Sequence, residues 1–530
     1  MQIKKQNSDK ILIGLLALSA IVRGVLAGWM ELGNDEVYYW TYALYPDWSH
    51  FDHPPMVGWM IQLFSLNLLF ESEFFLRLSS VVLMTADTYI IYRIAKEVKG
   101  AQAGLYAALL YTASVYAFVI TGVFILPDTP LMLFWLLAFW MAVRYFHGKN
   151  KYLLLFGLFS GLAMLSKYSG VFLWVGMGLY ILLFDRKQFK NPYLYLSLLI
   201  SALCCLPILY WNMQNDFVSF NFHGDRVGAG KLSFSTLGNE LAGEFLYNNP
   251  VNVVLAVLAV LAAFKGRIQM EKPTLRLVLC TALPLIGLFW LFSLTKPTLP
   301  HWNAPAYCLI LILVSCMLCD KHPETEGQFR LPKSIVAAMA FLLLTLVVGV
   351  AEIKTGFLPL DRHTEPETLG SDDFTLDMYG WRQLGEKFTD LRETAIAKGT
   401  MKETDGIVTD EWFPLANLDY YVARPLGLRV MGLGWLQWLH KYVWINEERG
   451  GLHLGESYWF LSDSRYPKNP QTLYLWYFEE IDLIGVIEIE RCGKPVKNFY
   501  VYGCKNLKVL PPNKEALIVA ASGTGKDTRR

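Results

Sequence analysis

The sequence predicts a polytopic α-helical membrane protein with a smaller α/β domain at its C-terminal end. Of its 530 residues, 54% are hydrophobic and 18% are charged, whereas soluble proteins average about 25% charged residues. Aromatic residues, which are included in the hydrophobic share, make up 15% of the chain and supply rings for the two membrane interfaces. The 47 basic and 46 acidic side chains leave a net charge of +1, which argues against a disordered chain or a basic nucleic-acid-binding face.

Apolar runs long enough for a bilayer alternate with short polar links from residue 11 to about residue 350. We expect about eleven membrane spans or more, near residues 11–30, 75–95, 102–124, 130–146, 152–166, 169–184, 193–211, 250–264, 275–294, 303–319 and 334–351. The runs 152–166 and 169–184 are short for a hydrocarbon core of ~30 Å, so they form either two spans or a re-entrant hairpin. No such run follows Glu352, and the predicted domains are 1–354 in the membrane and 355–530 outside it.

The orientation follows from the polar links that are rich in Lys and Arg. These clusters lie at the N-terminus and near residues 93–99, 144–151, 186–190, 265–276 and 321–333. Because basic loops are retained in the cytoplasm, the odd number of spans puts the C-terminal domain on the outer side. Of the eight cysteines, only Cys492 and Cys504 lie in that domain, and we predict a disulfide between them.

On this topology the unusual polar side chains gather at the outer membrane face. They are Asp35, Glu36, Tyr39, Asp52 and His53 in the first outer loop, then Asp128, Lys167, His223, Arg226, Lys296 and His301. Cations at such a face suit the phosphate of a lipid-linked donor, and they also stabilise that phosphate as it leaves. A carboxylate beside them suits the removal of a proton from an incoming hydroxyl or amine.

Each of these residues also has a purely structural interpretation. Asp35 is in place to cap an interfacial helix that begins at Glu36, Asp128 to start a helix, and Asp52-His53 to form a turn before two prolines. The cations suit interfacial or surface positions, and the aromatic cluster around Tyr39 suits a membrane interface. The gathering of all of them at one face favours a functional site.

The first outer loop resembles that of bacterial membrane glycosyltransferases related to the protein O-mannosyltransferases. The resemblance rests on Asn34-Asp35-Glu36 through Tyr39-Trp40 and on Asp52-His53-Pro54-Pro55-Met56. Later blocks follow in the same order: Pro127–Pro130, Gly161–Tyr168, Ser219–Arg226 and Leu299–Tyr307. This group has the GT-C fold and includes the aminoarabinose transferase of lipid A.

The resemblance implies an inverting glycosyltransferase of the bacterial inner membrane whose active site faces the periplasm. A sugar would pass from a polyprenyl-phosphate carrier to lipid A, another glycan or a protein. Asp35 matches the acceptor-activating base, Glu36 is its neighbour, and Asp128 matches a second acidic site that shapes the pocket or assists a metal. Carrier phosphate and sugar are assigned to Lys167, His223, Arg226, Lys296, His301, Asp52, His53 and Tyr39. No cofactor is certain, and a divalent metal stays open.

The C-terminal region resembles the α/β domain appended to many bacterial members of the group. The resemblance lies in Thr375–Trp381 and Gly406–Trp412, and we expect a helix over Leu415–Val422 and strands near Leu428–Met431 and Tyr458–Ser462. We assign this domain to acceptor handling. Asp410-Glu411 either binds acceptor or is an ordinary pair of surface acids.

Three other classes of protein were weighed against a glycosyltransferase. A flippase or transporter of a polyprenyl-linked glycan typically has internal repeats and charges at the bilayer midplane, and neither is found in the sequence. An O-antigen-type polymerase or ligase is closer in chemistry but does not predict an Asp-Glu block directly after the first span. A receptor with a membrane anchor has no need of eleven spans.

Overall fold

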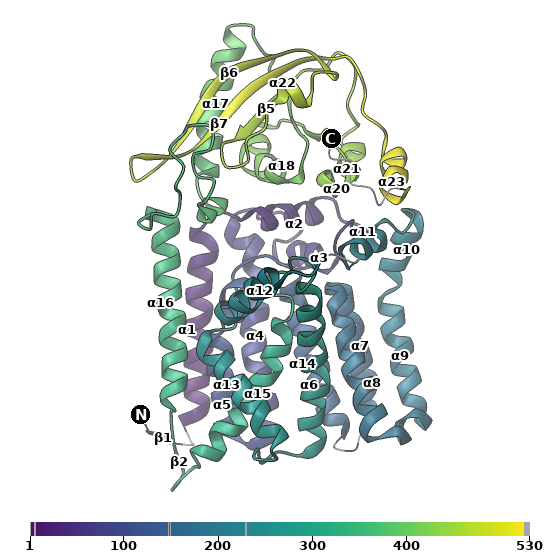
Figure 1. The fold of residues 1–530 in the computed structure, drawn as a ribbon, viewed down its shortest axis with the longest axis vertical. Helices are drawn as coiled ribbons and strands as arrows, with labels where there is room; N and C mark the ends of the chain where they lie inside the picture. The colour runs from purple at the N-terminus through teal and green to yellow at the C-terminus, as the bar shows by residue number, and fades with distance from the viewer. Residues whose placement is uncertain (1, 5–6, 147, 149, 228–230, 524–530) are drawn as a thin grey trace.

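A computed structural model describes residues 2–4, 7–146, 148, 150–227 and 231–523, with the side chains of 2, 225–227 and 522–523 excepted. It consists of a helical bundle capped at one end by the C-terminal α/β domain (Figure 1). Strands β1 (Gln2–Lys4) and β2 (Gln328–Arg330) pair in antiparallel fashion at the opposite end of the bundle. The N-terminal segment and the C-terminal domain therefore lie at opposite ends, as the predicted odd number of crossings requires.

The described residues contain six helices that are long and apolar enough to cross a membrane. They are α1 (Ser8–Trp29), α4 (Glu73–Lys99), α6 (Asp128–Phe146), α14 (Lys272–Ser293), α15 (Ala304–Lys321) and α16 (Lys333–Thr355). Two bent helix pairs raise the number to eight if each pair is one span. These are α9 (Pro192–Cys204) with α10 (Leu206–Gln214), and α12 (Phe234–Tyr247) with α13 (Pro250–Phe264). The chain is thus a multi-pass membrane protein.

Each of the eleven predicted segments contains a helix, but a count of eleven full spans is not confirmed. Helices α7 (Lys151–Ser166) and α8 (Phe172–Phe184) are short, and α5 (Ala101–Ala113) gives way to a π-helix, η2 (Tyr116–Ile120). Helices α12 and α13 meet at a bend of 103°, and the two residues between them, Asn248 and Asn249, are buried. There the Asn249 side chain donates to the carbonyls of Ala113, at 2.9 Å, and Ala338, at 2.8 Å. Such internal bonds let a helix break inside a bundle where lipid would not satisfy the backbone.

The C-terminal domain is built on a five-stranded mixed sheet with strand order β4-β3-β5-β7-β6. Strand β3 (Gly406–Thr409) is parallel to β4 (Val430–Gly432) and β5 (Tyr458–Asp463). The hairpin of β6 (Phe478–Arg491) and β7 (Lys494–Leu507) completes the sheet in antiparallel fashion. Helix α17 (Trp381–Ala397) packs on this hairpin, while α18 (Trp412–Leu418), α20 (Leu436–Leu439) and α21 (Tyr442–Glu448) lie between the sheet and the bundle (Figure 1).

The structure confirms the predicted mixed sheet, its strands β3, β4 and β5, and helical structure over Leu415–Val422. The predicted disulfide between Cys492 and Cys504 is wrong. Cys492 and Cys504 are both free. Arg491 pairs with Lys494, so Cys492 lies at the tip of the β6–β7 hairpin, whereas Cys504 pairs with Ile481 far along it. At about 3.3 Å per residue the two cysteines are roughly 30 Å apart, well beyond the reach of a disulfide.

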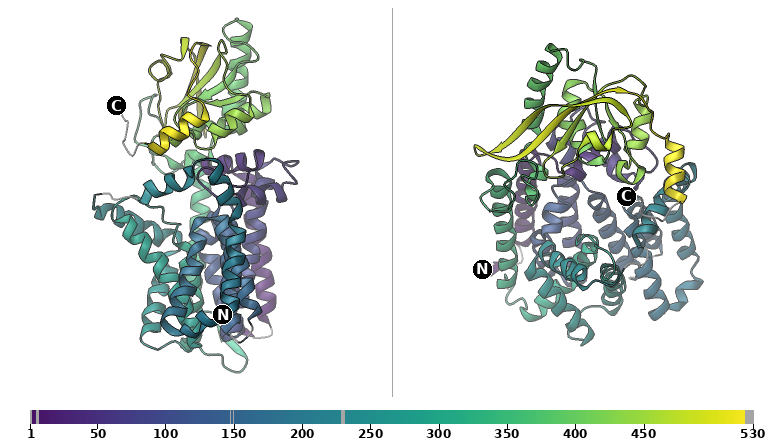
Figure 2. Two further views of the ribbon diagram at one scale, coloured as in Figure 1. Left: turned by 90° about the vertical axis from the view of Figure 1, so that its right-hand side faces the viewer. Right: turned by 45° about the horizontal axis from the view of Figure 1, so that its top comes forward.

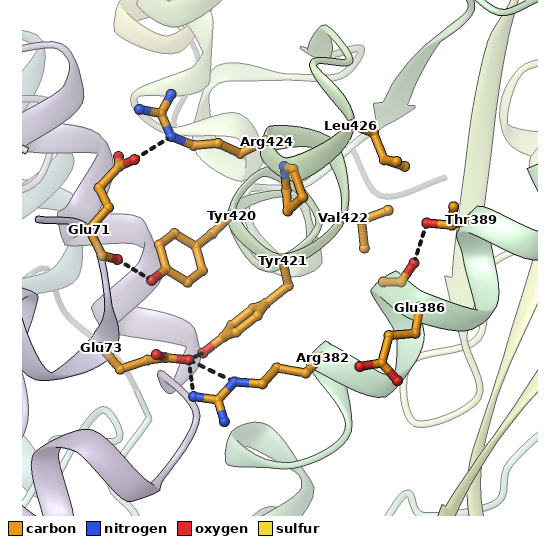
Figure 3. Close-up of a pocket in the computed structure, with 12 residues that line it drawn as sticks. Glu71, Glu73, Arg382, Glu386, Thr389, Tyr420, Tyr421, Val422, Arg424 and Leu426 are labelled. Carbon is orange, nitrogen blue, oxygen red and sulfur yellow. Dashed lines mark hydrogen bonds and ion pairs between the residues drawn. The ribbon is translucent and has the colours of Figure 1, made fainter. Parts of the chain in front are cut away.

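The C-terminal domain is docked on the bundle beside the start of α4. A pocket of about 500 Å³ lies at this junction (Figure 3). Arg424 Nε bonds Glu71 Oε2 at 2.8 Å, and Arg382 Nη2 bonds Glu73 Oε1 at 2.5 Å. Two further views show the domain over the same end of the bundle (Figure 2). Both arginines are partly exposed, so these ion pairs orient the domain more than they stabilise it.

Candidate active site

A cavity of about 1320 Å³ lies between the end of the bundle and the C-terminal domain. The structure brings nine of the predicted site residues together in its wall: Asp35, Tyr39, Asp52, His53, Asp128, Lys167, His223, Lys296 and His301. They come from segments far apart in the sequence, which the bundle collects at one end. Glu36 does not line the cavity, and the side chain of Arg226 lies outside the described residues.

Helix α2 (Asn34–Leu44) lies across this end of the bundle and carries the two adjacent acids (Figure 1). Acidic residues in a first helical turn interact favourably with the helix dipole. Asp35 is exposed to the cavity, whereas Glu36 points into the protein and is 3% exposed. The backbone N–H of Gly33 donates to Glu36 Oε2 at 2.8 Å, which fixes the start of the helix.

Glu36 is committed to a buried ion pair with Arg77 of α4. Arg77 Nε lies 2.7 Å from Glu36 Oε1, and Arg77 Nη2 lies 2.5 Å from Oε2. The backbone N–H of Ile125 also donates to Oε1, at 3.0 Å. These partners give Glu36 a structural position: it ties α2 to α4 and to the segment that leads into α6.

Asp128 and Lys167 form a second buried pair, in the wall of the cavity. Lys167 Nζ lies 2.7 Å from Asp128 Oδ2, and the Tyr116 hydroxyl donates to Oδ1 at 3.1 Å. Lys167 follows the last residue of α7 and is in extended backbone, which turns its side chain toward α6. The Asp128 carboxylate is thus held in place by two hydrogen-bond donors, Lys167 and Tyr116.

Asp52 forms the centre of a hydrogen-bonded cluster. Its Oδ1 accepts from the hydroxyls of Tyr38, at 2.8 Å, and Tyr42, at 2.5 Å. His223 Nε2 lies 2.8 Å from the Asp52 carbonyl, and His440 Nδ1 lies 3.8 Å from Oδ2. Burial by itself raises the pKa of Asp52, but the nearby histidines and the two hydroxyls outweigh it and hold the pKa below its usual range.

Asp35 has the opposite tendency. Removal from bulk water raises its pKa to about 6, helped by the negative charges of Asp52, Asp377 and Glu36 and opposed by Lys167. The Asp35 side chain is exposed to the cavity, but protein atoms surround the cavity on most sides. The carboxylate is therefore less well solvated than it would be in bulk water. A carboxylate with a pKa of about 6 is ionised at neutral pH and is a much better proton acceptor than an ordinary aspartate.

Two of the cavity histidines are neutral at physiological pH. Burial lowers the pKa of His53 to about 3 and that of His301 to about 4, although Asp52 and Asp128 partly offset the effect. The sequence predicts His301 to be one of the cations that bind the phosphate. As a neutral side chain it can instead donate a hydrogen bond to an anion. The lysines in the wall are Lys167, which is paired with Asp128, and Lys296.

Sequence reasoning missed the part of the cavity that the C-terminal domain supplies. Trp412, Leu436, Gln437, His440 and Ala521 line it from that side. The one signal was Trp412, which ends the Gly406–Trp412 block already singled out. The neighbouring Asp410 and Glu411 are bound to Lys468, at 2.7 and 2.9 Å, and do not line the cavity.

Within the part of the chain that the structure describes, one group of side chains has the spacing of metal ligands. It consists of Asp361, His363 and Asp372 in the C-terminal region, none of which lines the cavity. His363 and Asp372 are exposed, and Asp361 already accepts hydrogen bonds from the backbone N–H groups of His363 and Gly370.

Comparison with known proteins agrees with this architecture. Residues 52–211 match the family model of dolichyl-phosphate-mannose-protein mannosyltransferase. The lipid A galacturonosyltransferase RgtD of Rhizobium johnstonii is 23% identical over 404 residues, which is 75% of this chain and 78% of the relative. The undecaprenyl phosphate-alpha-4-amino-4-deoxy-L-arabinose arabinosyl transferase 2 of Proteus mirabilis is 24% identical over 319 residues, 55% of this chain and 56% of the relative.

Solved structures extend the similarity to the whole fold. ArnT from Cupriavidus metallidurans bound to undecaprenyl phosphate superposes with a TM-score of 0.63 over 95% of this chain and 99% of that one, at 13% identity. Its apo state gives a TM-score of 0.58 over 92% and 97% of the two chains. The chain thus has the fold of this GT-C glycosyltransferase and is similar in sequence to membrane glycosyltransferases, which agrees with the resemblance found in its motifs.

Proposed function

We propose that this protein transfers a sugar from an undecaprenyl-phosphate carrier to lipid A at the periplasmic face of the bacterial inner membrane. The single observation that carries the proposal is the cavity that joins Asp35 to the Lys167 and Lys296 side chains. A candidate base with a pKa of about 6 thus shares one chamber with two cations suited to a phosphate. One of the similar proteins is named for transfer to lipid A, and the other is named for an undecaprenyl-phosphate-linked sugar.

The proposed reaction is a single displacement with inversion. An acceptor hydroxyl or amine attacks the anomeric carbon while Asp35 takes its proton, so one C–O or C–N bond forms. The bond between the anomeric carbon and the phosphate oxygen breaks, and its electron pair leaves with the undecaprenyl phosphate. Lys167 and Lys296 stabilise the charge that grows on that phosphate, and His301 donates a hydrogen bond. No covalent sugar intermediate is needed.

The cavity wall supports entry of the donor from the bilayer. Beside the two lysines it contains apolar and aromatic side chains of α14 and the loop that follows, namely Leu288, Phe289, Phe292, Leu299 and Trp302. These suit a prenyl chain, whereas the carboxylates and histidines of the first outer loop suit a sugar. The acceptor would then enter between the bundle and the C-terminal domain, where Trp412 and Gln437 supply an aromatic face and an amide.

The proposed orientation rests on the basic residues at the opposite end of the bundle. Lys96 and Lys99 end α4 there, and Arg144 lies in the last turn of α6. A cytoplasmic location of this end satisfies the positive-inside rule and puts the cavity and the C-terminal domain in the periplasm.

The test is mass spectrometry of lipid A from cells with and without the gene. We expect one sugar mass to be missing without it, to return with the wild-type gene and to stay missing with Asp35→Asn. Asp482→Asn, at a partly exposed position on β6, is the matched control and should restore the sugar. An unchanged lipid A together with undecaprenyl-linked sugar accumulating on one leaflet would refute the proposal and favour a flippase.

A further inference from the structure

His440 has a backbone conformation that histidine rarely adopts. It follows the short helix α20 and has φ 50° and ψ −128°. This combination favours glycine, because a Cβ atom crowds the neighbouring backbone there. Residues kept in such a conformation persist only where the surrounding structure fixes them, and they concentrate at functional sites.

The next residue clamps this turn onto α2, the helix that carries Asp35. Lys441 Nζ donates to the carbonyl of Thr41 at 3.2 Å and to that of Tyr45 at 2.5 Å. The backbone N–H of Lys441 donates to the Tyr38 hydroxyl at 3.3 Å, and that hydroxyl donates in turn to Asp52. The strained turn is thus held by the same helix whose side chains form the cavity.

The His440 side chain points into the cavity and is only 8% exposed. Its ring stacks on Trp412, with centroids 5.8 Å apart and planes inclined by 24°, and it contacts the rings of Phe51 and Phe222. Its Nδ1 lies 3.8 Å from Asp52 Oδ2, on the opposite side of the carboxylate from the two tyrosine hydroxyls on Oδ1. The His440 ring therefore lies beside Oδ2 of Asp52, the carboxylate oxygen to which the two tyrosines do not donate.

We propose that His440 is a positioning residue of the transfer site, which the C-terminal domain inserts to fix the Asp52 carboxylate opposite Asp35. The proposal rests on the function proposed above and deepens it, because it makes the site a composite of both domains. His440 acts through Asp52: it sets where the second carboxylate charge of the cavity lies and thereby the surroundings in which Asp35 accepts a proton. The strained turn is retained because an unstrained one would not bring the ring to Asp52.

The experiment compares three variants of the full-length protein in detergent, with undecaprenyl-phosphate-linked sugar extracted from the source cells as donor and lipid A as acceptor. His440→Gly removes the ring and relieves the backbone. His440→Ala removes the ring but keeps the Cβ atom. His440→Asn keeps a nitrogen at the position of Nδ1 and tolerates positive φ better than most residues. His453→Ala, at a position with a 62% exposed side chain, is the control.

We expect His440→Gly to lower kcat by about tenfold or more, as misplacement of a catalytic group does, with a donor KM within about threefold of wild type. Its Tm should be higher than that of His440→Ala, because both variants lose the ring contacts but only glycine relieves the backbone strain. His440→Asn should recover most of kcat, and His453→Ala should match wild type.

Two results would overturn the role of His440 while leaving the proposed function intact. One is a His440→Gly enzyme with kcat close to that of wild type. The other is a loss of kcat that follows a falling Tm equally in all three variants, without recovery in His440→Asn. A wild-type protein that transfers no sugar would instead refute the proposed function itself.

Discussion

The pH dependence of sugar transfer is the sharpest test of Asp35 as the base. An ordinary aspartate has a pKa of 3.8, whereas burial and the neighbouring carboxylates raise that of Asp35 to about 6. The base works as the carboxylate, so activity should be about half-maximal near pH 6, approach its plateau above about pH 7 and fall at lower pH. With this pKa about 90% of the carboxyl is ionised at pH 7 and about 10% at pH 5, which predicts a roughly tenfold fall in kcat/KM.

The assay is kcat/KM for the donor lipid between pH 5 and pH 8, with mass-spectrometric detection of product. His53 and His301 titrate near 3 and 4, so neither produces a limb in this range. Asp35→Asn should lower turnover by about 10² to 10⁴ and abolish the limb, whereas Asp482→Asn should keep both rate and profile. A flat wild-type profile, or a limb near pH 6 that persists in Asp35→Asn, would refute the reasoning.

The dependence of folding stability on pH gives an independent check of the raised Asp35 pKa, and it needs no substrate. A carboxyl whose pKa is raised on folding costs stability once it ionises, so the cost is present above pH 6 and absent below the ordinary value of 3.8. Asp35→Asn removes this cost, and its Tm at pH 7.5 should exceed that of wild type. A lower Tm would mean that the carboxylate is structurally supported and poorly suited to act as a base.

Three further outcomes follow from the contacts described. Glu36→Gln should destabilise the protein by about 3–5 kcal/mol, because Arg77 is left as a buried unpaired charge, and thermal unfolding should show this even without donor. Lys167→Met should weaken undecaprenyl phosphate binding, measured as a smaller ligand-induced rise in Tm, while Lys167→Arg should retain part of it. Replacing the exposed Cys492 by serine should leave Tm unchanged in oxidising buffer, since no bond joins it to Cys504; a loss seen only under oxidising conditions would contradict the free thiols.

Much of the fold could be predicted because it depends on strong and local signals. Apolar runs located the helices, and alternation with turn residues located β3, β4 and β5. The number of full spans could not be predicted, because composition does not reveal the bend at Asn249 or the end of α5 at Ala113. Those breaks depend on hydrogen bonds between helices that are distant in sequence.

The candidate site divides in the same way. Residues next to membrane ends, such as Asp35 and Lys167, could be predicted to share a face because topology alone puts them there. The sequence could not predict that Asp35 and Glu36 take different positions, because both are acidic residues of the same helical turn. The buried Arg77 of α4 pairs with Glu36 and so leaves Asp35 to face the cavity. The sequence around Arg77 gives no signal of this pairing.

Segments of the C-terminal domain complete the cavity wall, from Trp412 through His440 to Ala521. Lys167 and Lys296, which we propose bind the donor, belong to the helical bundle and precede these segments in the chain. In the proposed orientation, the chamber is complete only after the C-terminal domain has crossed the bilayer and docked on the bundle. The proposed sugar transfer would then depend on correct membrane insertion, because a wrongly inserted protein lacks the wall that separates the site from bulk water.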